Sequence, residues 1–204
     1  MSGIVGSYFN TRGSGVVAKL GTDGQVFTSS GAGVSQDFEA AAGGGKINQV
    51  VQTLKQDVFT NTTEDAWVDI TDMSCAITPS ASDSKIIIQL SLYGGVNTPV
   101  TPSVQILRDI DGGGYSNLAT SSGTAASNRK AATCGTFNSG DGNQCQSLSS
   151  TTIDEPSTTD EVTYKLQLWQ DNTSTTNIGA SGGDSDAAHQ NRYPNTITLL
   201  EVLA

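Results

Sequence analysis

The sequence has few cysteines, few aromatic residues and no long apolar run. Its 204 residues include three Cys and one His, and 6% are aromatic. The cysteines form neither a CxxC pair nor a metal-ligand spacing. No stretch approaches the roughly 18 apolar residues of a membrane-spanning helix, and residues 1–10 lack the basic start and apolar core of a secretory signal. We expect a soluble protein, made in a cytosol, with no bound metal, no cofactor and no membrane insertion.

Basic residues are also scarce. Ten Lys and Arg face 20 Asp and Glu, so the net charge is −10 and the isoelectric point is near 4.3. A phosphate-lined polymer or an anionic membrane surface repels such a chain on average. Nucleic acid is therefore not an expected partner.

Catalytic constellations are missing as well. The single histidine, His189, lies in a polar loop, and no GxSxG motif supplies a nucleophile. The run Gly43–Lys46 does not make a phosphate-binding loop, because Ile47 stands where Ser or Thr is required. The four acids on either side of Pro156 are ordinary turn residues, although paired carboxylates can hydrolyse glycosidic bonds. We expect no enzymatic activity.

Two acidic loops have only part of a cation site. Asp109 and Asp111 precede glycines as at the start of a calcium loop, but the later acidic ligands are absent. Asp184 and Asp186 lie near the histidine in a Gly/Ser loop. We interpret the first as a hairpin turn and the second as a solvated loop, so no metal site is expected.

Strand patterns are what the sequence does contain. In Glu161–Gln170, Val162, Tyr164, Leu166 and Leu168 alternate with polar residues, which predicts a strand with one buried face. Lys85–Tyr93 has the same pattern, and we take it as the natural partner of the first strand. Two such strands imply a layered β core.

Further short strands complete a set of about eight. Lys46–Phe59 fits helical spacing, with a short three-stranded coiled coil as the alternative, but its β-branched residues favour a strand. Residues 111–114 predict a turn, and the small polar residues of 119–143 make a surface loop too long for an ordinary hairpin. The other predicted strands are Ala66–Met73, Val104–Arg108, Tyr115–Leu118, Leu148–Ile153, Thr176–Ile178 and Thr196–Leu203.

Residues 1–45 differ from the rest, because they lack a sustained period and end in AAAGGG, typical of a linker. We divide the chain into an arm, 1–45, and a body, 46–204. Within the arm, Asp23–Gly24 lies between short apolar pieces, as a hairpin turn requires. Composition alone favours a disordered Gly/Ser tail.

The arm resembles a known kind of segment. Asp23-Gly24-Gln25-Val26, followed by Thr28, Ser29, Gly31, Gly33 and Phe38, is similar to a segment of bacteriophage tail-fibre and related virion proteins, which often have Leu at Phe27 and Trp at Phe38. The opening SGIVGSYFNTRGSGVVAKLG resembles the start of short structural proteins of marine phages. The resemblance implies a trimeric appendage anchored on a virion. The implied anchor residues are Ile4, Val5, Tyr8, Phe9, Val16, Val17, Leu20, Asp23, Gly24, Gln25, Val26 and Phe38.

The body resembles phage trimeric jelly rolls akin to tumour-necrosis-factor-like domains. The resemblance rests on the Trp67 strand, the Pro79 turn, the hairpin at 109–112 and the run PSTTDEVTY before the terminal strand. It implies an all-β fold, an antiparallel jelly-roll β-sandwich that assembles as a homotrimer.

The terminal strand indicates a subunit contact. Ile197 and Leu199 fall on one face and Leu200 and Val202 on the other, so both faces are expected to be dry. We predict a trimer interface that contains Tyr164, Trp169, Ile197, Leu199, Leu200 and Val202.

Aromatic residues near polar loops suit either saccharide stacking or a subunit contact. Tyr115 and Tyr193 are the receptor-contact candidates. Cys134 and Cys145 bracket a glycine-containing loop that a disulfide could close, but a reducing cytosol favours free thiols.

These features together predict a virion fibre or fibre tip that binds a host surface glycan or protein. The alternatives are a capsid decoration protein or head fibre and, last, a polysaccharide-degrading tailspike, for which no internal repeat is present.

Overall fold

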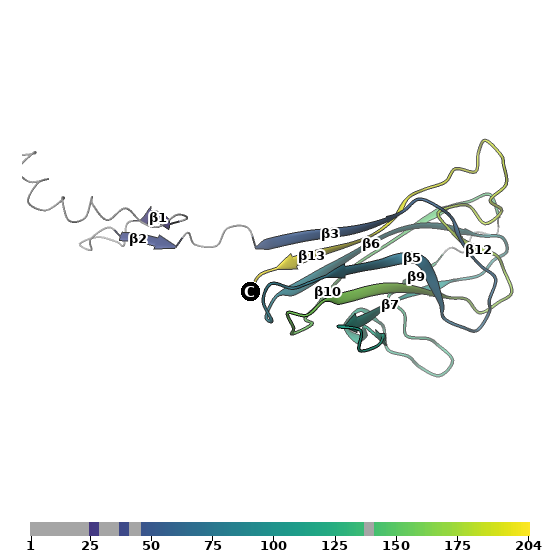
Figure 1. Ribbon diagram of the computed structural model, residues 1–204. Helices are drawn as coiled ribbons and strands as arrows, with labels where there is room; N and C mark the ends of the chain where they lie inside the picture. Colours follow the sequence, from purple (N-terminus) through teal and green to yellow (C-terminus); the bar gives the residue numbers. More distant parts are fainter. Residues whose placement is uncertain (1–24, 29–36, 41–45, 137–140) are drawn as a thin grey trace, which may run out of the picture. The chain divides into compact units, whose positions relative to one another are not determined.

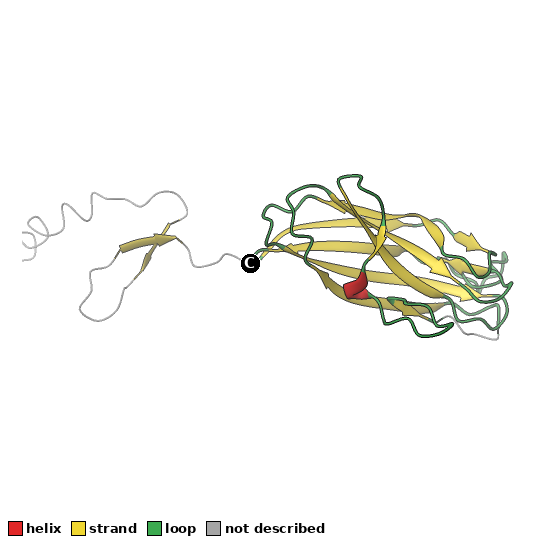
Figure 2. Cartoon of the chain, turned by 90° about the horizontal axis from the view of Figure 1, so that it is seen from below, coloured by secondary structure: helices red, strands yellow, loops and turns green. Residues whose placement is uncertain are grey.

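The computed structural model describes residues 25–28, 37–40, 46–136 and 141–204, and almost all of its regular structure is β-strand (Figures 1 and 2). The chain divides into two compact units, Met1–Lys46 and Ile47–Ala204. The one short 3₁₀ helix among the described residues is η1, Ala119–Ser121. No helix in the described ranges is long and apolar enough to cross a membrane.

The first unit contains one antiparallel strand pair. Strand β1, Gln25–Thr28, pairs with β2, Asp37–Ala40, so that Phe27 lies opposite Phe38. The chain between these strands is 29–36, so the predicted turn at Asp23–Gly24 does not connect them. Asp23 and Gly24 precede β1 and lie outside the described residues.

The second unit consists of two sheets. The larger sheet has the order β3–β13–β6–β10, and the short strands β12 and β4 extend it beyond β13 along β6. The smaller sheet has the order β5–β11–β7, with the short strands β8 and β9 both paired to β7. The larger sheet is made of β3 Ile47–Lys55, β4 Phe59–Asn61, β6 Lys85–Val96, β10 Gln146–Asp154, β12 Thr176–Ile178 and β13 Asn195–Val202, and the smaller one of β5 Val68–Ile77, β7 Ser103–Ile110, β8 Ser116–Asn117, β9 Cys134–Gly135 and β11 Val162–Trp169.

The connectivity is that of a jelly roll. We count β8 and β9 as one interrupted strand and set aside β4 and β12, which leaves eight strands in chain order from β3 to β13. The first, eighth, third and sixth of these (β3, β13, β6 and β10) form one sheet. The second, seventh, fourth and fifth (β5, β11, β7 and β8 with β9) form the other. All strand pairs in this unit are antiparallel, and two such sheets are the jelly-roll form of the β-sandwich. The predicted all-β antiparallel jelly-roll sandwich is confirmed.

The core fills the space between the sheets. Strand β11 contributes the apolar side chains that alternate in its sequence, and Val162, Tyr164, Leu166 and Leu168 are all fully buried. Strand β6 faces them from the other sheet with Ile86, Ile88, Leu90 and Leu92. The two strands therefore share a core, as expected, but they lie in opposite sheets and do not pair.

Local signals locate two elements well. Ile47–Lys55 is a strand paired to β13, so the coiled-coil alternative is wrong. The turn after β7 has positive φ at Asp111 and Gly112, 50° and 70°, and Gly113 N donates to Ile110 O at 2.9 Å. Positive φ at both central residues defines the type I′ hairpin turn that Asp-Gly favours.

The long polar segment 119–143 is partly structured. It begins with η1, and its Cys134–Gly135 pairs with β7 next to Ser103 and Val104. Thr133 N also donates to Val104 O at 2.8 Å. Residues 133–135 of this segment therefore belong to the edge of the smaller sheet, while residues 137–140 lie outside the described residues.

The second unit has two distinct ends. Val202 pairs with both Ile47 and Lys85, so the first residue of this unit and the end of its last strand lie together, at what we call the proximal end (Figure 1). The opposite, distal end carries the connections 97–102, 171–175 and 179–194. At that end Gly182 packs against β6 so closely that a Cβ there would lie 2.1 Å from Val96 C. Glycine is therefore required at Gly182.

Candidate functional site

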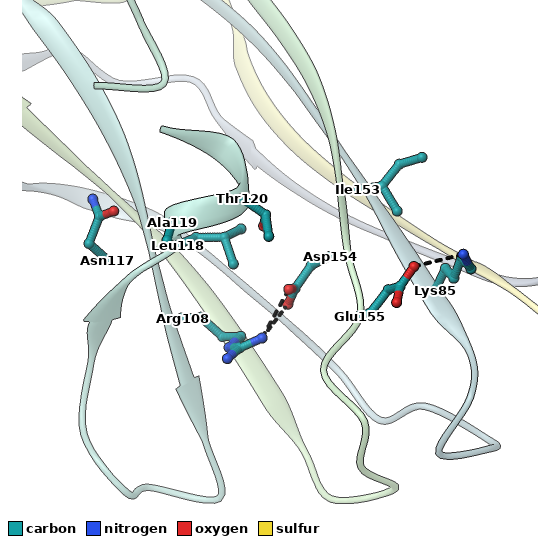
Figure 3. A pocket seen from close by; sticks show the side chains of 9 residues that line it. All are labelled: Lys85, Arg108, Asn117, Leu118, Ala119, Thr120, Ile153, Asp154 and Glu155. Atoms are coloured by element: carbon teal, nitrogen blue, oxygen red, sulfur yellow. Dashed lines mark hydrogen bonds and ion pairs between the residues drawn. The ribbon is translucent and has the colours of Figure 1, made fainter. Parts of the chain in front are cut away.

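A charged cluster joins the two sheets at the proximal end. Arg108 on β7 points inward and its Nη1 lies 2.9 and 3.0 Å from the two carboxylate oxygens of Asp154 on β10 (Figure 3). Tyr164 on β11 donates its hydroxyl to Asp154 Oδ2 at 2.7 Å. Burial, reinforced by the charge of Asp154, raises the pKa of Tyr164 far above its usual value, so the phenol remains a donor.

A shallow depression of about 670 Å³ lies over this cluster, at the open side of the sandwich between β10 and β7. Both of its cations are paired, because Lys85 Nζ contacts Glu155 Oε1 at 2.7 Å and Arg108 contacts Asp154 (Figure 3). Asp154 is nearly fully buried, and each of its oxygens is engaged. The cluster thus suits holding the sheets together more than it suits turning over a substrate. Its lining residues are Lys85, Arg108, Asn117, Leu118, Ala119, Thr120, Ile153, Asp154 and Glu155.

The predicted trimer-interface residues do not lie on one surface. Tyr164, Ile197 and Leu199 are fully buried in the core of the single chain, so a partner chain cannot reach them. The strand alternation aims Ile197 and Leu199 inward together with Glu201. Leu200 and Val202 instead point outward from the larger sheet and remain partly exposed. Only these two and Trp169 stay available for a contact between chains.

Trp169 lies on the outer face of the smaller sheet, as its strand position predicts. The ammonium of Lys130, from segment 119–143, lies 5.7 Å from the centre of its ring. The indole Nε1 is buried and has no hydrogen-bond partner within the described structure. Part of this tryptophan is therefore already covered by its own chain.

The two receptor-contact candidates lie at opposite ends. Tyr115 is 43% exposed beside the turn after β7, at the proximal end, with Lys165 Nζ 4.0 Å from the centre of its ring. Tyr193 lies in a distal connection and stacks on Tyr93, with ring centres 5.2 Å apart and planes 22° from parallel. A single binding surface cannot include both tyrosines.

The distal connections are tied to one another by side-chain amides. Gln190 Nε2 donates to Asn143 Oδ1 at 2.6 Å, and His189 Nε2 lies 3.3 Å from the same oxygen. Gly183 N donates to Gly142 O at 2.8 Å. The single histidine therefore takes part in a polar contact between loops.

Sequence reasoning missed a polar row across the smaller sheet. Asn117 donates to Gln105, Gln105 to Gln167, and Gln167 to Asp69, each at 2.7 Å. Lys165 also donates to Asp69 at 2.8 Å, and this hydrogen bond, with that from Gln167, lowers the pKa of Asp69. Alternating polar residues on single strands indicate only a solvated face, so the row becomes visible only once the strands are placed side by side.

Predicted sites elsewhere have different outcomes. In the arm, Ile4, Val5, Tyr8, Phe9, Val16, Val17, Leu20, Asp23 and Gly24 lie outside the described residues, while Gln25 and Val26 lie in β1 and Phe38 in β2. Among the described residues, no group of three or more His, Cys, Asp or Glu is placed to hold a metal ion.

All three cysteines are free thiols. Burial raises the pKa of Cys134 to about 12 and that of Cys145 to about 11. Because the thiolate is the reactive form, we expect the folded protein at pH 7.5 to be alkylated at both positions at least about a hundredfold more slowly than an exposed thiol. Mass spectrometry over a time course measures this, with denatured protein as the fully reactive control. Rapid labelling of either residue in folded protein would contradict the burial argument.

No protein-family model and no curated protein sequence matches this chain. Solved structures of infectious bursal disease virus are similar to it: the Gx strain with 13% identity and a TM-score of 0.41, over 88% of this chain and 43% of that chain. The Gt strain has 11% identity and a TM-score of 0.40, over 91% and 45%. A VP2 subviral particle has 12% and 0.38, over 88% and 42%. This chain thus spans less than half the length of those chains, and likenesses at these TM-scores carry no conclusion about function.

Proposed function

We propose that this protein is a virion structural component, a fibre or fibre tip that assembles as a homotrimer in the host cytoplasm, attaches to the particle through residues 1–45 and contacts the host surface. The observation that carries the proposal is the division of the chain into the unit Met1–Lys46 and a jelly-roll body that begins at Ile47. The body starts and ends at its proximal end, which leaves the distal connections free to meet another surface.

The charged and polar clusters of the body support a binding role rather than turnover. Arg108 and Asp154 neutralise each other between the sheets, and His189 contacts an amide. Enzymes place titratable groups beside a nucleophile or a bound water, whereas Arg108 and Asp154 are engaged with each other. A capsid decoration protein or head fibre fits the same division of the chain. A tailspike ranks last, because such enzymes combine paired acids in a groove with a repetitive solenoid.

Removal of residues 1–45 tests the attachment role. We expect the shortened protein to fold and associate as the full chain does, because the jelly-roll core lies entirely within Ile47–Ala204. Its incorporation into particles should fall to background when measured by immunoblot of purified virions. A matched control replaces residues 1–45 with a Gly/Ser segment of equal length. Normal incorporation of either variant would refute anchoring by this segment.

The place of attachment on the particle distinguishes a tail fibre from a capsid decoration protein or head fibre. Labelled copies on tails, imaged on intact particles, are expected for a fibre, and labelled copies on heads would favour the decoration protein. A protein absent from purified particles would overturn the proposed function as a whole.

A further inference from the structure

The outer face of the larger sheet is polar in its centre and apolar towards the proximal end. By "outer face" we mean the side chains that point away from the core on the four long strands of that sheet. They are Ile47, Val50, Gln52 and Leu54 on β3, Thr196, Thr198, Leu200 and Val202 on β13, Lys85, Ile87, Gln89, Ser91 and Tyr93 on β6, and Ser147, Ser149, Thr151 and Ile153 on β10.

An apolar row crosses this face in register. Val50 lies opposite Leu200, Leu200 opposite Ile87, and Ile87 opposite Ile153, on four neighbouring strands. Val50 is 58% exposed and Ile153 52% exposed. Ile47, also 52% exposed, pairs with Val202 next to the row and widens it. Large apolar side chains that are grouped and exposed in this way mark an interaction surface.

Charge distinguishes this face from the rest of the molecule. The chain contains 20 acidic residues, yet none of the outer-face side chains is acidic and Lys85 is the only charged one. Lys85 is itself neutralised by Glu155 at the rim. By contrast, the outer face of the smaller sheet carries Asp69 and Lys165. Depletion of charge around exposed apolar side chains is one mark of an interface centre.

The net charge of the chain restricts where two copies can meet. Two copies with a charge of −10 each repel one another over most of their surface, and the uncharged outer face is where they can approach at least cost. One sheet face can also pack against another sheet face to face. If several copies turn their outer faces towards a common axis that runs parallel to the strands, their apolar rows are buried against one another. Every Ile47 then lies at the same end of the assembly. We propose that the outer face of the larger sheet is the surface through which copies of this chain associate.

This inference rests on the proposed homotrimer and locates its contact. Sedimentation of the full chain at micromolar concentration should give a trimer mass. The variants Val50→Glu and Leu200→Asp each place an acid in the apolar row. They should weaken association at least about a hundredfold, because an unpaired charge is costly to bury. Ser74→Asp is the matched control, since Ser74 is exposed on the smaller sheet opposite Lys165. It should remain trimeric.

Two single-cysteine variants provide a second test of the contact if a charged variant fails to fold. Gln89→Cys places a thiol at the centre of the outer face, and a short bifunctional maleimide should join it between chains. Ser74→Cys should not be joined. The native thiols serve as a slow background, because Cys75 is buried and desolvation raises the pKa of Cys134 to about 12 and that of Cys145 to about 11.

The outcomes separate the inference from the proposed function. A wild-type trimer whose Val50→Glu and Leu200→Asp variants stay trimeric overturns the outer face as the contact and leaves the trimer standing. A wild-type dimer that both variants dissociate supports the face and overturns the trimer. A wild-type monomer overturns association between copies, and so does a monomer that binds a different protein through this face. Incorporation into particles is read independently from removal of residues 1–45.

Discussion

Replacement of Arg108 by Ala is expected to destabilise the jelly roll by about 3–5 kcal/mol, as measured by chemical denaturation. Asp154 is nearly fully buried and receives both Nη1 contacts from Arg108. Without the guanidinium, the Tyr164 hydroxyl is the one side-chain donor that the described residues leave to this carboxylate. A buried charge left with one neutral donor is among the costliest defects that a single substitution creates.

The double variant Arg108→Leu with Asp154→Leu separates the charge defect from lost packing. Replacing both members of a buried ion pair with apolar residues is often neutral or stabilising, so part of the lost stability should return, less the cost of the Tyr164 hydroxyl that loses its acceptor. Tyr164→Phe is the smaller change, since it removes one hydrogen bond to the charged Asp154 and leaves the ion pair, and it should cost about 1.5–3 kcal/mol. If Arg108→Ala unfolds at the wild-type denaturant midpoint, the cluster does not join the sheets.

The jelly roll was predictable because its long strands carry strict alternation. Each of the residues Val162, Tyr164, Leu166 and Leu168 is apolar and buried, and the polar residues between them point outward. The pairing of the strands was harder to predict from the sequence, because a period-two pattern shows which face of a strand is buried but not which strand lies beside it. For this reason β6 and β11, the two clearest strands, were expected to be partners and prove to face each other across the core.

The interface prediction failed in part for a related reason. Val202 and Leu200 point outward, as the pattern of the last strand indicated, but Ile197 and Leu199 share their face with Glu201, which is fully buried. A strand with apolar residues on both sides suggested two dry faces against a partner chain. One of those faces is dry because it packs into the core of its own chain.

The clusters that join distant segments were the least predictable. Arg108 and Asp154 are 46 positions apart in sequence, and neither lies in a motif. An isolated Arg on a strand and an Asp before a proline turn are ordinary in sequence. Their significance depends on both side chains pointing into the core at the proximal end, which only the sheet order determines.

The contacts of Glu201 also depend on the order of the strands. Replacement of Glu201 by Gln is expected to lower the free energy of unfolding at neutral pH by about 2–4 kcal/mol, because hydrogen bonds to charged groups are among the stronger ones. Its Oε1 accepts from Ser80 N at 2.6 Å and from the hydroxyls of Ser80 and Ser84 at 2.7 Å. Its Oε2 accepts from Asn48 and Gln49 at 2.9 and 2.8 Å. A glutamine at this position turns one acceptor into an amide donor that faces other donors.

The pH dependence gives Glu201→Gln a second readout. Burial alone would raise the pKa of Glu201, but the hydrogen bonds from Asn48, Ser80 and Ser84 outweigh it and lower the pKa to about 2. A carboxyl whose pKa is lower in the folded state contributes stability that is fully present above its unfolded pKa of roughly 4.3 and is lost as pH falls towards about 2.

The difference in the free energy of unfolding between wild type and Glu201→Gln should therefore be constant from pH 8 to about 5 and shrink below about 4. Denaturation curves at half-unit pH steps measure the gap, and the difference between the two proteins cancels the other acids. A gap that stays constant down to pH 2.5 would show that the Glu201 carboxylate does not hold this cluster together.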